Sequence, residues 1–290
     1  MDVASLQAFI AVAEAGSFSA AAEQLYLTQP AVSKRIAVLE DSLAARLFDR
    51  IGRRTTLTEA GRALLPRARR ILAELEDSRR AIANLSAHIT GRLSIGTSHH
   101  IGLRRLPPVL RAFNGTYPDV ELDLRFMDSE AVCAAVEHGE LELGVVTLPV
   151  QPAVVLTTEP IWDDPLDAVV AVDHALARTR PATLEQLGAY PAILPARGTY
   201  TREIMEQAFS RLGLVIRPGP STNYLETIRM LVAVGLGWSM LPRSMVDEEL
   251  QIITPGRLHI KRSLGVVRHR ERTLSNAARA LIALLHAAPS

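Results

Sequence analysis

The sequence has a single cysteine, almost no net charge and no long apolar run. One cysteine, Cys133, among 290 residues excludes an internal disulfide and a paired-thiol redox centre. No uninterrupted apolar segment reaches the roughly 20 residues that a membrane-spanning helix needs. The opening residues, MDVASLQAF, are acidic and do not lead from a basic segment into an apolar run, as a signal peptide does. We therefore expect a cytoplasmic protein without a membrane partner.

Motifs of catalysis and of metal or cofactor binding are also absent. The sequence contains no GxSxG, no HExxH, no P-loop and no GxGxxG followed by a distant acid. The eight histidines are scattered, apart from the pair His99 and His100, and they show no metal-ligand spacing. We therefore expect neither an enzyme nor a metal site nor a bound cofactor.

Positive charge is concentrated in one stretch, although the net charge of the chain is only +1. From Lys34 to Arg70 there are ten Lys or Arg residues against four acidic residues. Such a block can neutralise the phosphates of a nucleic acid. The alternative is a solvated charged face without a partner.

The first 57 residues predict three helices followed by two short strands. Apolar residues at helical spacing from Leu6 to Ala13 indicate a first helix, which Gly16 ends. Ser17 and Thr28 are placed to cap a second and a third helix. The short strands would lie around residues 47–48 and 55–57, with arginines between them.

The third predicted helix has an apolar and a polar face. Its apolar positions follow the spacing 4, 3 and 4 and are Val32, Ile36, Leu39 and Leu43. Its polar face presents Gln29, Ser33, Lys34 and Ala37. Gln can pair with adenine and Lys can reach guanine, and the major groove of DNA admits one α-helix. An Ala-rich helical hairpin used only for packing is the alternative.

Residues 9–50 and the segment 55–61 closely resemble the winged helix-turn-helix of LysR-type transcriptional regulators, without a gap over about the first 65 residues. The resemblance implies DNA contacts from the third helix and from the wing. The residues expected at the DNA are Ser17, Thr28, Gln29, Pro30, Ser33, Lys34, Arg50, Arg53 and Arg54.

A long helix is predicted from Thr58 to about His88. Positions at spacings of 4, 3, 4, 3, 4 and 3 form a heptad repeat of Leu64, Ala68, Ile71, Leu75, Ser78, Ile82 and Leu85. Because one helix cannot bury such a stripe by itself, we expect dimerisation through Leu64, Ala68, Ile71, Leu75 and Ile82. The alternative is packing of the stripe on its own domain. Pro66 should kink the helix or loosen its start.

Beyond Gly91, short apolar runs alternate with helical stretches, a pattern typical of α/β folds. The expected strands are 93–96, 120–127, 143–147, 167–172, 192–194, 238–241 and 264–267. Residues 129–149 and 224–242 repeat one pattern of helix, Gly turn, apolar strand and Leu-Pro. The repeat predicts two similar lobes with a cleft between them.

The family resemblance implies the same architecture, an α/β effector domain like periplasmic solute-binding proteins. We expect a winged helix-turn-helix domain at 1–57, a linker and dimerisation helix at 58–90 and an effector domain at 91–290. Within the last, lobe I would comprise about 91–162 and 266–290, and lobe II about 163–265. The chain would cross between the lobes near 160–167 and 259–264, and a last helix at 274–286 would pack on lobe I.

The effector is expected beyond the carboxyl ends of the strands, near helix N-termini. The expected contacts are Thr97, Ser98, His99, His100, Asp128, Thr147, Arg197 and Thr199. Among them, Ser98, His100, Thr147, Arg197 and Thr199 are implied by the family resemblance, and Asp128, like the neighbouring Ser129, is a weaker addition. Donors outnumber acceptors in this set, which favours a small anion or carboxylate. Alternatively, Arg197 pairs with Glu203, and His99 or His100 faces solvent. Cys133 lies on an apolar helical face and is expected to be a packing residue.

These observations predict a sequence-specific transcriptional regulator controlled by a small molecule. Its expected partners are double-stranded DNA with an interrupted inverted repeat and a second copy of itself. By resemblance, a homotetramer follows, and RNA polymerase is a further candidate partner. A solute-binding module, an enzyme on the α/β lobes and a sequence-indifferent architectural protein are the alternatives.

Overall fold

A computed structural model describes residues 1–51, 54–86, 88–179, 182–256 and 258–288, without the side chains of residues 50, 51 and 54. The chain forms two compact units, one made by residues 1–86 and the other by nearly all of residues 87–290. Among the described helices, none is both long and apolar enough to cross a membrane.

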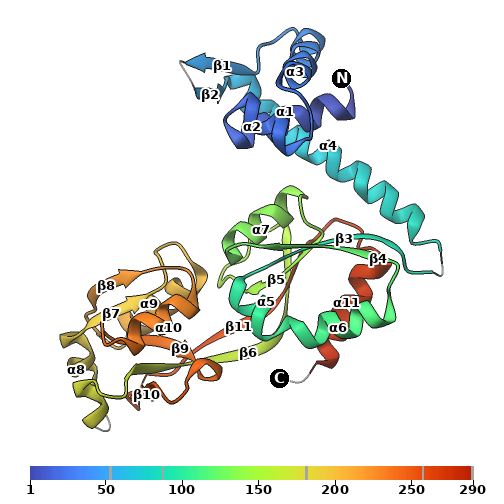
Figure 1. Ribbon diagram of the computed structural model, residues 1–290. Coiled ribbons are helices and arrows are strands. Elements are labelled where there is room, and N and C mark those ends of the chain that lie inside the picture. Colours follow the sequence, from blue (N-terminus) through green and yellow to red (C-terminus); the bar gives the residue numbers. More distant parts are fainter. Residues whose placement is uncertain (52–53, 87, 180–181, 257, 289–290) are drawn as a thin grey trace. The chain divides into compact units, whose positions relative to one another are not determined.

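The first unit is a three-helix domain with a β-hairpin and a long final helix (Figure 1). Its elements are α1 (Val3–Ala15), α2 (Phe18–Gln24), α3 (Gln29–Leu43), β1 (Phe48–Ile51), β2 (Arg54–Leu57) and α4 (Glu59–Ala83). The β1 and β2 strands pair antiparallel. Gly16 takes the left-handed backbone (φ 61°) that ends α1, and Ser17 caps α2. Buried apolar residues of α1, α2 and α3 form one core, as their helical spacing predicts.

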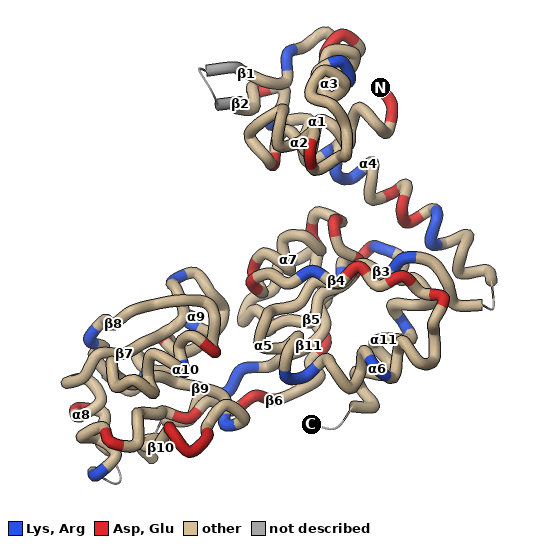
Figure 2. The backbone as a smooth tube through the Cα atoms, in the orientation of Figure 1, with Lys and Arg blue, Asp and Glu red and all other residues tan. Residues whose placement is uncertain are grey.

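The helix α4 belongs to this unit and is continuous through Pro66. Thr58 caps it by accepting a hydrogen bond from the Gly61 amide at 3.0 Å, and its own hydroxyl donates to the Arg46 carbonyl at 2.7 Å. Lys, Arg, Asp and Glu residues are spread along the helix (Figure 2). The capping hydroxyl therefore ties the start of α4 to the base of the hairpin.

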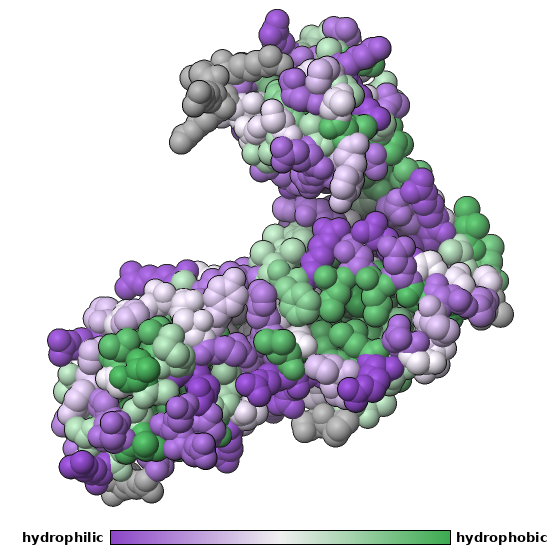
Figure 3. Space-filling model, in the orientation of Figure 1, coloured by the Kyte–Doolittle hydropathy of each residue, from purple (hydrophilic) through white to green (hydrophobic). Residues whose placement is uncertain are grey.

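The heptad repeat on α4 divides into a packed half and an exposed half. Leu64 and Ala68 lie in the core of the first unit, and Ala68 has no exposed surface left for a partner helix. The expected dimer contact at Ala68 is therefore wrong, because α1 and α3 need an apolar helix face to close their own core. In contrast, Ile71 and Ile82 are 41% and 72% exposed, and Leu85, in the turn after α4 ends at Ala83, is 87% exposed. Figure 3 shows hydrophobic residues on the surface near the C-terminal end of α4. Part of the apolar repeat is therefore left on the surface of the first unit.

The second unit contains the remaining elements, which form two lobes (Figure 1). Those of the first half are β3 (Gly91–Thr97), α5 (His99–Arg104), α6 (Leu106–Thr116), β4 (Val120–Phe126), α7 (Ser129–His138), β5 (Leu143–Thr147) and β6 (Leu156–Ala171). Then follow η1 (Ala175–Arg178), α8 (Leu184–Ala189), β7 (Pro191–Leu194), α9 (Tyr200–Arg211), β8 (Arg217–Ser221) and α10 (Leu225–Ala233). The last are β9 (Ser239–Pro242), η2 (Arg243–Met245), β10 (Leu250–Ile252), β11 (Ile260–His269) and α11 (Asn276–Ala287).

The two lobes repeat one topology. In lobe I, β4, β3 and β5 are parallel neighbours, and in lobe II, β7 pairs with β8 in parallel and bridges to Trp238, next to β9. Gly139 and Gly235, at equivalent turns after α7 and α10, both have left-handed φ angles, 80° and 84°. Each lobe has its own apolar core. The expected internal repeat thus corresponds to a repeated α/β unit.

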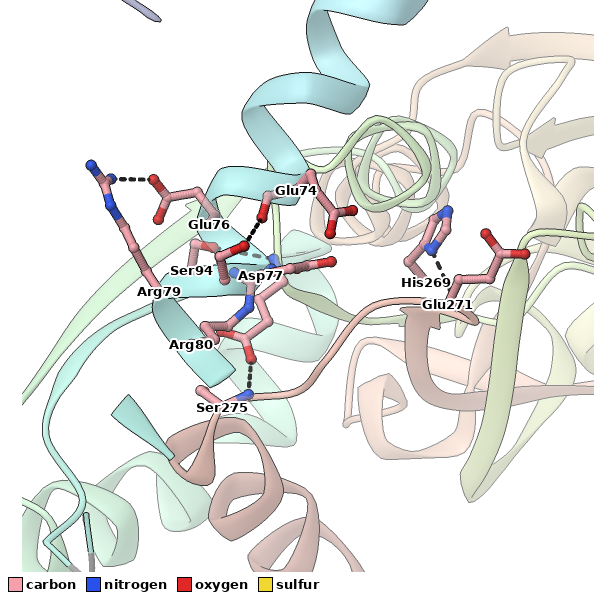
Figure 4. Close-up of polar contacts among 11 residues, drawn as sticks. Glu74, Glu76, Asp77, Arg79, Arg80, Ser94, His269, Glu271 and Ser275 are labelled. Atoms are coloured by element: carbon pink, nitrogen blue, oxygen red, sulfur yellow. Dashed lines mark hydrogen bonds and ion pairs between the residues drawn. The ribbon is translucent and has the colours of Figure 1, made fainter. Parts of the chain in front are cut away.

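The last helix, α11, packs on lobe I beside α6 (Figure 1). Ser275 caps it, and the Ser275 amide donates to Glu142 Oε1 at 2.6 Å (Figure 4). The Glu142 amide in turn donates to Ser94 Oγ at 3.1 Å. The start of α11 is therefore joined through Glu142, which directly precedes β5, to Ser94 on β3.

The crossovers between the lobes are not loops but two long antiparallel strands, β6 and β11, which run through both. Their register shifts between Leu264 and Gly265, where Ile161 is an extra residue on β6. Pro160 lies at this bulge, where a missing N–H is tolerated. The expected strands omit the first part of β6 and all of β8, because both segments contain prolines. They also omit β10, which has only three residues.

Replacing Gly265 by alanine should destabilise the second unit by about 1–3 kcal/mol. A Cβ atom at this position would lie 2.2 Å from the Glu159 carbonyl oxygen, so the backbone of β6 would have to move. Gly115→Ala is the matched control, because nothing lies within 4 Å of its added Cβ. Urea unfolding followed by tryptophan fluorescence measures the difference. Equal stability of the two variants would show that the bulge adapts without cost.

Candidate functional sites

The first candidate site is the exposed face of α3. Gln29 Nε2 donates to Ser33 Oγ at 2.9 Å, so these two side chains are held together on the helix surface. Lys34 is exposed beside them, and Pro30 occupies the first turn. Thr28 is the N-cap residue, yet its hydroxyl makes no capping hydrogen bond. The face therefore offers an amide, a hydroxyl and an ammonium group, with a second hydroxyl at the helix N-terminus.

The β-hairpin after α3 is anchored at its base. Glu40 Oε1 accepts a hydrogen bond from the Leu47 amide at 2.7 Å, and the Thr55 amide donates to the Gly16 carbonyl at 3.3 Å. Arg50 and Arg54 lie on β1 and β2, although their side chains are not described, and Arg53 lies outside the described residues. Ser17 Oγ accepts from the Ala20 amide at 3.4 Å.

Tyr26 is a surface feature that the sequence pattern did not indicate. It lies in the turn between α2 and α3, has a left-handed backbone (φ 54°) and is 96% exposed. Its ring adds an exposed hydroxyl close in sequence to Thr28.

The second candidate site is a cavity of about 50 Å³ between the lobes of the second unit. It is surrounded by the first residues of α5, α7, α9 and α10, by the end of β5 and by β11. The lining side chains are Ser98, His99, His100, Asp128, Ser129, Glu130, Thr147, Pro195, Thr199, Thr201, Asn223, Leu225 and Arg262. Six of the eight expected contacts are thus brought together in one cavity.

Thr97 and Arg197 are the two expected contacts that lie elsewhere. Thr97 is fully buried, and its hydroxyl donates to the Val145 carbonyl at 2.8 Å, which joins β3 to β5. Arg197 is exposed and lines a different groove with Arg202 and Glu206. The turn at Gly198 (φ 87°) separates it from Thr199, which faces the cavity. The structure therefore places neither side chain in the cavity.

The cation of the cavity is Arg262 on β11, which the sequence did not reveal. It is 4% exposed, and its Nε donates to Asp164 Oδ2 at 2.7 Å. Its Nη1 donates to Thr201 Oγ1 at 3.1 Å, while the buried Nη2 makes no hydrogen bond but lies 2.7 Å from Asp164 Oδ2 in an ion pair. In the sequence, Lys261 and Arg262 look like the polar residues at the end of a strand. Arg262 meets Asp164 because β11 pairs with β6, and these two residues are distant in sequence.

The lobes contact each other directly around the cavity. Asn223 Nδ2 of lobe II donates to Asp128 Oδ2 of lobe I at 2.7 Å, and the Tyr200 amide donates to Glu130 Oε1. The His99 ring packs against Tyr224, with ring centroids 5.0 Å apart. These three contacts hold the cavity closed.

His100 is the most enclosed titratable group of the cavity. It is 5% exposed, and its Nδ1 lies 3.7 Å from Glu226 Oε1 on α10. Burial, assisted by the positive charge of Arg262, lowers its pKa to about 4. The ring is therefore neutral at pH 7.

Cys133 is 3% exposed in the packing of α7, and burial raises the pKa of its thiol to about 11. A thiol of this kind stays protonated near pH 7, which fits the expected packing role. Within the described residues, His, Cys, Asp and Glu side chains form no group that could hold a metal ion.

Two family models match the chain. Residues 3–62 match the bacterial regulatory helix-turn-helix protein, lysR family, and residues 86–290 match the LysR substrate binding domain. The regulator YeiE of Escherichia coli K12 is 34% identical over 283 residues, covering 94% of this chain and 93% of YeiE. A regulator from Azotobacter vinelandii is 71% identical over 108 residues, which is 37% of this chain and 75% of that protein.

Solved structures of similar proteins have the same fold. CbnR in complex with its target DNA aligns with a TM-score of 0.66 at 24% identity, covering 99% of both chains. Full-length OxyR from Pseudomonas aeruginosa aligns with a TM-score of 0.72 at 22% identity, covering 99% of this chain and 95% of that one.

Proposed function

The chain belongs to the LysR family and is a DNA-binding transcriptional regulator with an effector-binding domain, not an enzyme; from this premise we propose that a small anion or carboxylate in the cleft controls its sequence-specific binding. The observation that carries the proposal is the cavity at Arg262. Its hydroxyl groups and buried guanidinium are donors suited to an anion. Helix N-termini favour negative charge as well.

The size of the cavity limits the ligand. One water requires about 10–15 Å³ of such volume, so 50 Å³ accommodates only a few non-hydrogen atoms. Small oxyanions and short carboxylates meet this limit, whereas aromatic or nucleotide ligands exceed it. A larger ligand would require the contacts between Asn223 and Asp128 and between Tyr200 and Glu130 to open.

Control follows from differential binding to two arrangements of the lobes. The ligand is enclosed by groups of both lobes, so it binds most tightly when they are closed. A ligand shifts a conformational equilibrium only by its difference in affinity for the two states. The effector domains of paired chains would pass this shift on to the spacing of their DNA-binding domains.

We also propose that α4 pairs two chains through the exposed half of its heptad repeat. The exposed Ile71 and Ile82 on α4, and the exposed Leu85 in the turn after it, support this proposal. A pair of DNA-binding domains would bind an interrupted inverted repeat, since two-fold protein symmetry is matched by a symmetric site. A homotetramer and a contact with RNA polymerase are further parts of the proposal.

Removing two hydroxyls from the cleft, with Ser98→Ala and Thr199→Ala together, should abolish the ligand response and leave DNA binding within about twofold of wild type. Both side chains line the cavity and lie far in sequence from α3. Fluorescence anisotropy of a DNA site, with sulfate or acetate added, measures both properties.

The matched control removes hydroxyls outside the cleft, with Thr116→Ala and Ser210→Ala together. It should respond to the anion as wild type does. A full response in the Ser98 and Thr199 variant would place the ligand elsewhere, and loss of folding in circular dichroism would make these hydroxyls structural.

A further inference from the structure

We propose that His100 contacts the cleft anion directly and takes up one proton from solvent when the anion binds, so that the imidazolium joins the anion to Glu226 across the lobes. This inference rests on the proposed function and specifies how the site balances the charge of its ligand. It makes His100 a specificity-determining residue for anions.

The first support is the set of buried polar atoms without partners. Neither ring nitrogen of His100 has a hydrogen-bond partner in the described structure, although the ring lines the cavity. Glu226 Oε1 is also buried without a hydrogen-bond partner. It lies 3.7 Å from His100 Nδ1, which exceeds a hydrogen bond, and 4.0 Å from Arg104 Nε. Buried polar groups are nearly always hydrogen-bonded, so these atoms indicate a contact that forms with the ligand.

The second support is the charge around His100. Seven charged groups lie around His100. The cations are Arg262 of β11, Arg104 of its own helix and Arg105, which is paired to Asp164. The carboxylates are Asp164 of β6, Glu226 of α10, Asp128 before α7 and Glu130 on α7. These are three arginines and four carboxylates. Arg262 is already paired to Asp164, so an anion would enter a site without a spare positive charge.

A proton on His100 supplies that charge. Without a ligand, burial and Arg262 lower the pKa of His100 to about 4, so the ring is neutral near pH 7. A negative charge in contact with the ring favours its charged form and raises the pKa. Because the bound state then holds more protons than the free state, the anion should bind more tightly as the pH falls.

The test is isothermal titration calorimetry of the full chain with sulfate and with acetate, at pH 6, 7 and 8. Neither probe titrates in this range, so any proton taken up belongs to the protein. Each titration is repeated in two buffers of different ionisation enthalpy, which gives the number of protons taken up per anion. We expect uptake that approaches one proton at pH 6 and affinity that rises by up to about tenfold per pH unit lowered.

Variants assign the proton to His100. His100→Gln should bind the anion more weakly, with no proton uptake and no pH dependence. Glu226→Gln keeps the imidazole but removes its partner, so uptake at pH 7 should fall. His174→Gln is the control, because His174 lies in lobe II outside the cavity and its pKa is also lowered by burial. It should behave as wild type.

The possible failures are distinct. Anion binding without proton uptake in wild type overturns this inference and leaves the proposed function standing. Uptake that persists in His100→Gln assigns the proton to another group, such as His99, and also overturns it. Failure of both anions to bind wild type removes the small-anion effector, and the inference with it.

Discussion

Replacing Ile82 by aspartate should dissociate the protein into monomers and weaken binding to an inverted-repeat DNA site by about a hundredfold or more. Ile82 is 72% exposed near the end of α4, beyond the part of the helix that packs in the core of the first unit. A charge there would have to be buried between two helices, which is costly without a partner. Once the chains separate, each DNA-binding domain binds one half-site alone, and the gain of two-site binding, 10²–10⁴, is lost.

Sedimentation velocity gives the mass, and fluorescence anisotropy gives the affinity for DNA. Ala83→Asp is the control, since it adds the same charge at an exposed position about 100° around the helix from Ile82. It should stay dimeric. A dimer that survives Ile82→Asp would show that the exposed apolar stripe serves another purpose.

Replacing Ser33 or Gln29 by alanine should cost about 1–3 kcal/mol at the preferred DNA site and little on random DNA. The two side chains are joined by a 2.9 Å hydrogen bond on the exposed face of α3, so we expect the serine to position the amide for a base edge. A double-mutant cycle should therefore show coupling between them.

The control for this experiment is Ser42→Ala, the same substitution in the same helix. The Ser42 hydroxyl donates to the Leu39 carbonyl at 2.8 Å, near the other end of α3, so its loss should change affinity for both DNAs little. Equal losses on preferred and random DNA for Ser33→Ala would reject base reading by this face.

The sequence predicted the helical part of the fold well because helical spacing is local. The stripe of Val32, Ile36 and Leu39 on α3 is buried as expected. The heptad repeat was also recognised, but the spacing could not show that Leu64 and Ala68 pack on the domain itself while Ile82 stays exposed. That division depends on which helices lie beside α4.

Strands were predicted where apolar runs are continuous, as at β5, and missed where proline interrupts them. Pro160 and Pro165 lie within β6, and Pro218 and Pro220 within β8. Pro160 is tolerated because it lies at the bulge of β6. The prolines of β8 are tolerated because β8 pairs only with β7 in the described structure and so is an edge strand. Pairing partners distant in sequence decide both cases.

The cleft was predicted in part for the same reason. Ser98, Asp128 and Thr199 follow strands or begin helices, positions that a sequence displays, and the structure brings them together. Arg262, Asn223 and Glu130 reach the cavity only through the pairing of β11 with β6 and the closure of the lobes. Arg197 also follows a strand, as Ser98 does, which is why the sequence predicts it at the cleft. In the structure it lies in a different groove, next to the turn at Gly198.

We propose that a small anion in the cleft controls binding to a specific DNA sequence. The most direct test is the affinity of the full chain for a DNA site selected from random sequence, measured by anisotropy with and without saturating sulfate or acetate. A shift of about 5–150-fold with one of these anions, absent in the Ser98→Ala and Thr199→Ala variant, is the predicted result. Identical affinity with and without each anion, at concentrations where calorimetry shows the cleft to be filled, would contradict it.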